Sequence, residues 1–70
     1  MSLKKGTLKS FDADTYTATI QLSGSNSIYL EGIAVARNLP PIEMVVGRKV
    51  AVVFFTESNP KDAVVVGVYI

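Results

Sequence analysis

The clearest pattern along the chain is an alternation of apolar and polar residues between Thr15 and Leu22. A repeat of two residues is typical of a β-strand, because successive side chains of a strand point to opposite faces of the sheet. The pattern predicts a strand with one dry and one wet face. The apolar positions are Tyr16, Ala18, Ile20 and Leu22, and the polar ones are Thr15, Thr17, Thr19 and Gln21.

Two further runs, Val50 to Phe55 and Ala63 to Val68, are rich in β-branched and aromatic residues. The segment from Glu57 to Asp62 between them holds turn-forming residues, so the runs predict a β-hairpin. Both runs are apolar at odd and at even positions. We therefore expect both faces of this hairpin to be covered, whereas one face is usually enough on an antiparallel sheet.

Two more strands are predicted from Lys4 to Phe11 and from Ser27 to Arg37. In the first, Gly6 is a position where the strand can bend sharply or approach another backbone. In the second, Gly32 stands where the apolar positions change parity, which predicts a bulge at a barrel corner. Pro40 and Pro41 end this strand.

Five short strands with glycine corners favour one fold class. The expected fold is all-β, a single domain over residues 1–70 that forms a small five-stranded antiparallel barrel of the OB-like kind, with an SH3-like barrel as the alternative. A flat open sheet of this length would expose apolar edges.

The amino-acid composition limits the kinds of chemical site that the chain can form. The chain of 70 residues has no Cys and no His, so disulfides and thiolate or imidazole metal sites are excluded. A domain this small has a marginal core, and self-association is the remaining source of support. Without the commonest general base and the strongest nucleophile, we expect no enzyme, no catalytic residues, no metal site and no cofactor.

Alternation assigns one parity of the hairpin to the barrel interior and the other to the outside. We expect the outer residues to pack against a second copy of the chain. In the alternative interpretation, neighbouring strands and the Pro40 to Val46 segment cover them within one chain. The expected interior residues are Val50, Val52, Phe54, Val64, Val66 and Val68, and the expected interface residues are Ala51, Val53, Phe55, Val65 and Tyr69, with the faces open to reversal by one bulge.

Polar residues elsewhere offer few sites. Asp12 and Asp14 are two apart and would suit a hard cation, but turn residues that bond their own backbone are the favoured interpretation. The Ser23-Gly24-Ser25 segment has no nearby base and is typical of a hairpin. Glu31 is more often a solvated or paired strand residue than a buried acid.

Nucleic-acid binding is the alternative use of such a barrel, because OB-type barrels can combine a basic groove with aromatic stacking platforms. The formal net charge of only +1 argues against it, as do the acidic residues interspersed among the basic ones. The candidates for phosphate contact are Lys4, Lys5, Lys9, Arg48 and Lys49, and those for base stacking are Phe11, Tyr16 and Tyr29.

The run from Pro41 to Tyr69 resembles the end of the OB-fold barrel of phage baseplate and tail-spike proteins and of type VI secretion spikes. In that family a proline-containing loop leads to a glycine, a V-x-V-x-F strand, a polar turn and a closing strand that ends in a glycine and an aromatic residue. These features correspond to Pro41, Gly47, Val50-x-Val52-x-Phe54, Asn59 to Asp62, and Val64 to Tyr69. Spike proteins normally continue into a needle segment, and the sequence stops at Ile70, which argues against a membrane-piercing role.

The resemblance implies a structural barrel that joins copies of itself or adjoining phage-tail-like components. The expected function is therefore a non-enzymatic assembly module, and the alternative is a domain that binds single-stranded nucleic acid or oligosaccharide. No apolar run is long enough for a membrane span, and the N-terminus lacks the apolar core of a signal peptide. We expect a cytoplasmic or phage-particle-associated protein.

Overall fold

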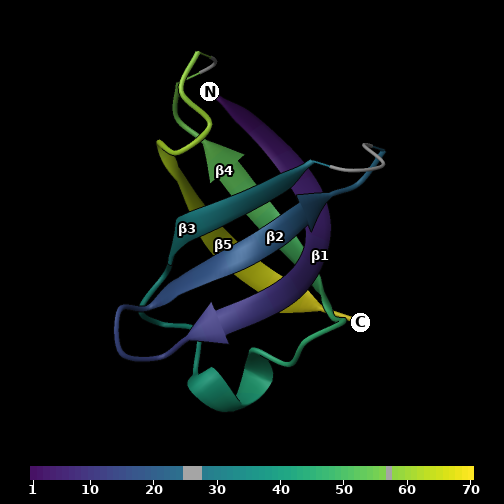
Figure 1. The fold of residues 1–70 in the computed structure, drawn as a ribbon, viewed down its shortest axis with the longest axis vertical. Coiled ribbons are helices and arrows are strands. Elements are labelled where there is room, and N and C mark those ends of the chain that lie inside the picture. Colours follow the sequence, from purple (N-terminus) through teal and green to yellow (C-terminus); the bar gives the residue numbers. More distant parts are fainter. Residues whose placement is uncertain (25–27, 57) are drawn as a thin grey trace.

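The computed structural model describes residues 1–24, 28–56 and 58–70. These residues form five strands and a single 3₁₀ turn, arranged as a small barrel in which β1, β2 and β3 lie in front of β4 and β5 (Figure 1). The elements are β1 (Ser2–Asp12), β2 (Thr17–Leu22), β3 (Tyr29–Val35), η1 (Pro41–Glu43), β4 (Lys49–Phe54) and β5 (Ala63–Tyr69).

The barrel is closed in the order β1-β2-β3-β5-β4, with β4 returning to β1. This confirms the predicted all-β barrel and is consistent with a small OB-like or SH3-like fold. One pairing differs from the prediction, because β3 runs parallel to β5 and the other pairs are antiparallel. The parallel seam joins only Ala34 to Val64 and Val35 to Val65. Neighbours in sequence predict hairpins, but a pairing between strands this far apart leaves no local pattern.

Strand β1 is longer than predicted and pairs with two different strands, one along each half. Its N-terminal half pairs with β4, and its C-terminal half pairs with β2. The two halves meet at Gly6, where an added Cβ would lie 2.7 Å from the carbonyl oxygen of Gln21 and 2.7 Å from Cγ2 of Ile20. The predicted close approach at Gly6 is thus confirmed, and it lets one strand bend into two neighbours.

The predicted corner at Gly32 is also present. Gly32 has a φ of +69°, and two residue steps of β2, from Ala18 to Ile20, oppose three steps of β3, from Leu30 to Ile33. This extra residue is a β-bulge, which glycine accommodates because it has no Cβ to clash at positive φ. The predicted strand began at Ser27, which lies outside the described residues.

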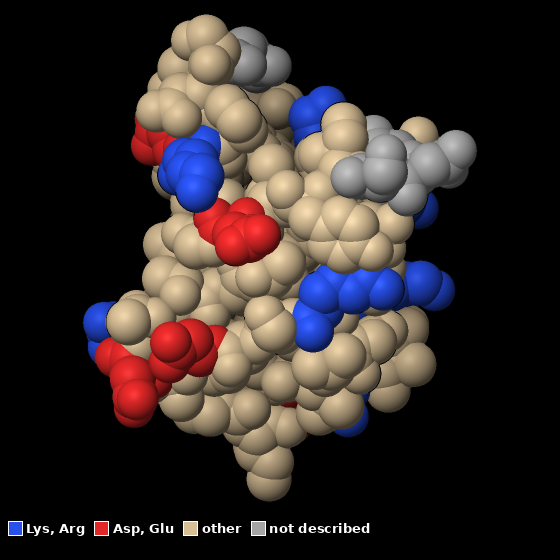
Figure 2. Space-filling view, viewed as in Figure 1, with Lys and Arg blue, Asp and Glu red and all other residues tan. Residues whose placement is uncertain are grey.

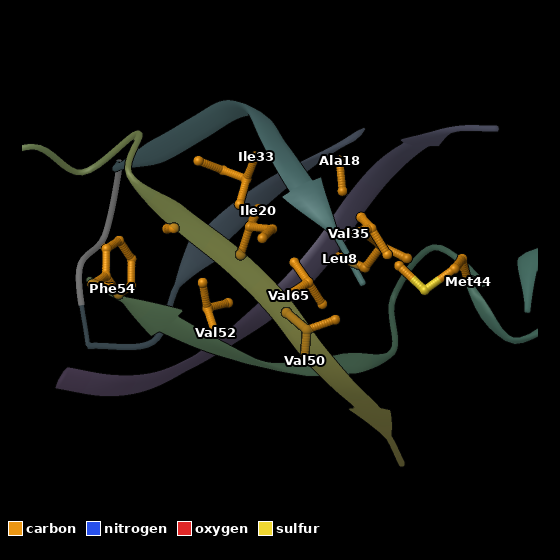
Figure 3. Close-up of a cluster of buried hydrophobic side chains, with 11 residues drawn as sticks. Leu8, Ala18, Ile20, Ile33, Val35, Met44, Val50, Val52, Phe54 and Val65 are labelled. Atoms are coloured by element: carbon orange, nitrogen blue, oxygen red, sulfur yellow. The ribbon is translucent and has the colours of Figure 1, made fainter. Parts of the chain in front are cut away.

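The interior is filled by alternate residues of all five strands and by Met44 (Figure 3). Phe54 lies at one end of the core and Met44 at the other, next to Leu8 and Val35. No polar or charged side chain among the described residues is buried in it. The buried set is Leu8, Ala18, Ile20, Ile33, Val35, Met44, Val50, Val52, Phe54, Ala63 and Val65.

The β4–β5 hairpin forms as predicted, but a bulge changes the faces of β5. The register shifts between Ala51 and Val52, so that Val66 is an extra residue between Gly67 and Val65. Ala63 and Val65 therefore point inwards ahead of the bulge, and Val68 packs against the core beyond it. The interior assignment is confirmed for Val50, Val52, Phe54 and Val68, and it is wrong for Val64, which is half-buried, and Val66, which is exposed.

Candidate self-association surface

The outer surface of β1, β4 and β5 carries an apolar stripe that crosses all three strands. The residue pairs that form it lie side by side in the sheet: Leu3 opposes Val53, Val53 opposes Val64, and Ala51 opposes Gly67. An added Cβ on Gly67 would lie 3.9 Å from the Cβ of Ala51, so these two residues face the same side. We define the apolar stripe as Leu3, Ala51, Val53, Phe55, Val64, Val66, Gly67 and Tyr69.

Several stripe residues are well exposed for apolar side chains. Leu3 has 68% of its surface accessible, Phe55 51% and Val66 41%. Ala51, Val53 and Val64 are half-buried beside them, and they make the surface continuous between the larger side chains. Contiguous apolar surface of this kind marks sites of protein association, whereas a single exposed leucine or valine does not.

Charged side chains flank the apolar stripe. At one end Lys49 pairs with Tyr69 across the hairpin, whereas Lys5 lies beside Ala51, in the middle of the stripe. At the other end the backbone N–H of Phe55 donates to the carbonyl of Asp62, whose carboxylate accepts a hydrogen bond of 2.6 Å from Thr56. Lysines therefore lie at one end and beside the middle of the stripe, and the Asp62 carboxylate lies at the other end, next to Lys61 in sequence.

The Pro40 to Val46 segment does not cover the stripe. The η1 turn lies below the barrel, at the end opposite the N-terminus (Figure 1), and Met44 plugs that end of the core. The side chains on either side of Met44 remain outside, with Ile42 81% and Val46 61% exposed. The interpretation in which this segment covers the hairpin within one chain is therefore wrong.

Four of the five predicted interface residues, Ala51, Val53, Phe55 and Tyr69, belong to the apolar stripe. The fifth, Val65, is a correction: it is fully buried, because the β5 bulge places its side chain inside the barrel. The prediction missed Leu3, Val64 and Val66. Predicting a bulge at Gly67 would have placed Val64 and Val66 on the outer surface. Predicting that β1 begins at Ser2 would have added Leu3.

The residues proposed for nucleic-acid contact are distributed over several surfaces. Lys4, Lys5 and Lys9 lie on β1, whereas Arg48 precedes β4 and pairs with Glu43 at 2.7 Å. The view of β1, β2 and β3 shows basic side chains on both sides of the molecule, with acidic ones beside those on the left and no continuous basic groove (Figure 2). Lys49 lies at one end of the stripe on the β4 side.

The three aromatic candidates do not form one stacking platform. Tyr29 is 51% exposed on β3. Tyr16 and Phe11 meet edge to face, with ring centroids 5.1 Å apart, at a corner of the barrel. The guanidinium of Arg37 lies 5.2 Å from the Tyr16 ring centroid, and the Tyr16 hydroxyl donates to the Leu39 carbonyl. Tyr16 is thus held by structural contacts.

A shallow hollow of about 260 Å³ opens on the outer surface of β1, β2 and β3. Its lining includes the carboxylates Asp12 and Glu31 beside hydroxyl groups. The Asp12 carboxylate accepts a hydrogen bond of 2.9 Å from the backbone N–H of Asp14, which confirms the turn interpretation of this pair. Glu31 is exposed, as expected for a solvated strand residue. The negative lining of the hollow disfavours phosphate binding.

Among the described residues, no helix is long and apolar enough to cross a membrane. In the same part of the chain, no three acidic, histidine or cysteine residues gather closely enough to hold a metal ion. Within the predicted Ser23-Gly24-Ser25 turn, Gly24 has a φ of +84°, and Ser25 lies outside the described residues. No protein-family model, curated protein or solved structure matches the chain.

Proposed function

We propose that this protein is a non-enzymatic assembly module whose barrel associates with other copies of itself through the apolar stripe. The observation that carries the proposal is the exposure of Leu3, Phe55, Val66 and Tyr69 on one continuous three-stranded surface. Burying a large apolar side chain stabilises an interface by about 1.5–3 kcal/mol, so this surface favours association.

The rest of the molecule supports a structural role. The interior is packed with aliphatic side chains, and the exposed hollow is shallow and lined by turn and strand residues. The sequence resemblance to barrels of phage baseplates and spikes supports an assembly of the phage-tail-like kind, in which such a barrel joins copies of itself or adjoining components. We propose that setting for the module, in the cytoplasm or in a phage-like particle.

The test is the molar mass in solution as a function of concentration. Light scattering and sedimentation from 5 to 500 µM should show an oligomer that dissociates on dilution, a range chosen because a small interface typically gives micromolar affinity. A monodisperse monomer over the whole range would contradict the proposal.

Gly67→Lys is the sharpest disrupting variant. The nearest atom to an added Cβ is the Cβ of Ala51 at 3.9 Å, an ordinary contact, so the lysine can be accommodated on the folded barrel. It places a charge in the middle of the stripe, and burying an unpaired charge is strongly unfavourable. Association should weaken at least about hundredfold. Ser10→Lys, on exposed β1 surface away from the stripe, is the matched control and should leave the mass unchanged.

A further inference from the structure

A small pocket opens at the end of the barrel where β1 begins and β4 ends, opposite the η1 turn (Figure 1). Its volume is about 130 Å³. The mouths of β-barrels are among the places where small-molecule sites form, with apolar walls and a few polar groups. We call this one the mouth pocket and define it by its lining residues, which are Ser2, Lys4, Leu22, Phe54, Thr56 and Pro60.

The register between β1 and β4 turns Lys4 towards the inside of the barrel. Residues directly opposite each other in an antiparallel pair point to the same face of the sheet. Lys4 lies opposite Val52, which is fully buried in the core. Ser2 lies opposite Phe54, which is only 5% exposed. Two polar residues of β1 therefore occupy inward positions at the mouth, where β4 carries apolar side chains.

Neither of these polar side chains has a partner in the described part of the chain. The Lys4 ammonium forms no ion pair there. The Ser2 hydroxyl oxygen is shielded from solvent and has no hydrogen-bond partner there either. A shielded hydroxyl without a partner is unfavourable, and rotation about its Cα–Cβ bond gives it other staggered positions from which to reach a ligand. An oxygen acceptor bound at the mouth would satisfy both groups.

The walls and the charge of the mouth pocket select the class of ligand. Phe54 belongs to the core and Leu22 packs against it, so these two side chains offer an apolar wall. The exposed Lys4 supplies a positive charge, which binds a carboxylate more strongly than a neutral group. On another side of the pocket, Thr56 donates to the Asp62 carboxylate at 2.6 Å, so an anion must bind on the Lys4 side.

We infer that the mouth pocket binds a short aliphatic carboxylate, with its alkyl chain against Leu22 and Phe54 and its carboxylate at Lys4. An engineered cavity of about 150 Å³ with aliphatic and aromatic walls holds benzene, so a pocket of about 130 Å³ suits a chain of about four or five carbons. This binding does not depend on self-association, because Leu3 and the rest of the apolar stripe lie on the outer face of the same strands.

Chain length tests whether the ligand enters a pocket of this size. Propanoate, butanoate, pentanoate and octanoate are titrated at constant ionic strength, and the backbone amide signals are followed by nuclear magnetic resonance. Each methylene that enters should tighten binding about fourfold, up to pentanoate at roughly 1 mM. Octanoate should gain no more than about twofold, because its further carbons stay in water. Adsorption to the apolar stripe would instead strengthen with every added methylene.

Substitution of Lys4 tests the role of its charge. Pentanol has the same alkyl chain without a charge, and it should bind the wild type about tenfold more weakly than pentanoate. Lys4→Gln should abolish this difference and leave the affinity for pentanol unchanged. Lys5→Gln is the matched control, because it removes the same charge from the next residue, which points outwards opposite Ala51. Unchanged amide spectra of both variants without ligand verify the fold.

The results separate a pocket from unspecific adsorption. Saturable shifts at the amides around Leu22 and Phe54, a plateau at pentanoate, and loss of the preference for charge in Lys4→Gln alone would support the site. Three results would each overturn it: no saturable shift at 50 mM pentanoate, affinity that rises evenly through octanoate, or equal effects of Lys4→Gln and Lys5→Gln. The proposed self-association is judged separately, from the molar mass.

Discussion

Tyr16 is the only residue other than glycine, within residues 1–24, 28–56 and 58–70, that has a positive φ, at 56°. This left-handed conformation is unfavourable for a tyrosine by about 1–2 kcal/mol. Several contacts hold it in place: the hydroxyl donates to the Leu39 carbonyl, the ring packs against Phe11, and Arg37 lies over its face. Tyr16 thereby ties the β1–β2 turn to the segment that follows β3.

The Tyr16→Phe substitution should lower the free energy of unfolding by about 1 kcal/mol, because it keeps the ring and removes one partner of a part-buried hydrogen bond. Urea denaturation followed by circular dichroism measures this change. Tyr29→Phe, at a tyrosine with 51% of its surface exposed, is the control and should change stability by less than about 0.5 kcal/mol. Equal effects of the two substitutions would contradict a structural role for the Tyr16 hydroxyl.

At the scale of the element, the bulge in β5 decides which valines stabilise the barrel. Val65 is fully buried, and Val66, its neighbour in sequence, is 41% exposed. Val65→Ala should destabilise the monomer by about 2 kcal/mol through lost burial and the cavity left behind. Val66→Ala should change it by less than about 0.5 kcal/mol. Chemical denaturation of both variants at a concentration below dimerisation checks the difference, and the reverse order would place the bulge elsewhere.

The β5 bulge is a feature that the sequence pattern could not predict. Alternation predicted β2, and the single glycines at Gly6 and Gly32 predicted a close approach and a corner that the structure confirms. From Ala63 to Val68 nearly every position is apolar, so apolar and polar residues do not alternate. The sequence therefore cannot show which of these side chains point inwards. Ala51, Val53 and Phe55 were correctly placed on the outer surface because β4 has no bulge. The β5 bulge reverses the faces, so Tyr69 beyond it was placed correctly and Val65 before it was wrong.

At the scale of the whole molecule, association should make thermal stability depend on concentration. A partner that binds only the folded chain raises the melting temperature by mass action. For a domain of this size we expect a rise of about 5 °C between 5 and 500 µM, measured by calorimetry. The Gly67→Lys variant should melt at one temperature over the whole range. A concentration-independent wild type would indicate that the stripe stays exposed.

The sequence predicts that the chain self-associates and which strands take part, but not which charged residues surround the contact. The lack of Cys and His and the small size indicated that extra support would be needed, and the two-sided hairpin indicated where. The charges beside the stripe could not be predicted from composition, because Lys5 and Lys49 reach one surface only when β1 pairs with β4. Contacts between distant strands decide such an arrangement, and they leave no local signature.

The short parallel seam between β3 and β5 has a mechanical consequence. Two paired positions hold these strands together, whereas the β1–β4 and β4–β5 pairs run along most of their strands. Because this seam is the shortest pairing in the closed barrel, we expect thermal fluctuations to separate β3 from β5 before any other pair of strands. Val64 belongs both to this seam and to the apolar stripe, so a second copy packed on the stripe would contact the β5 side of the seam and restrict its opening.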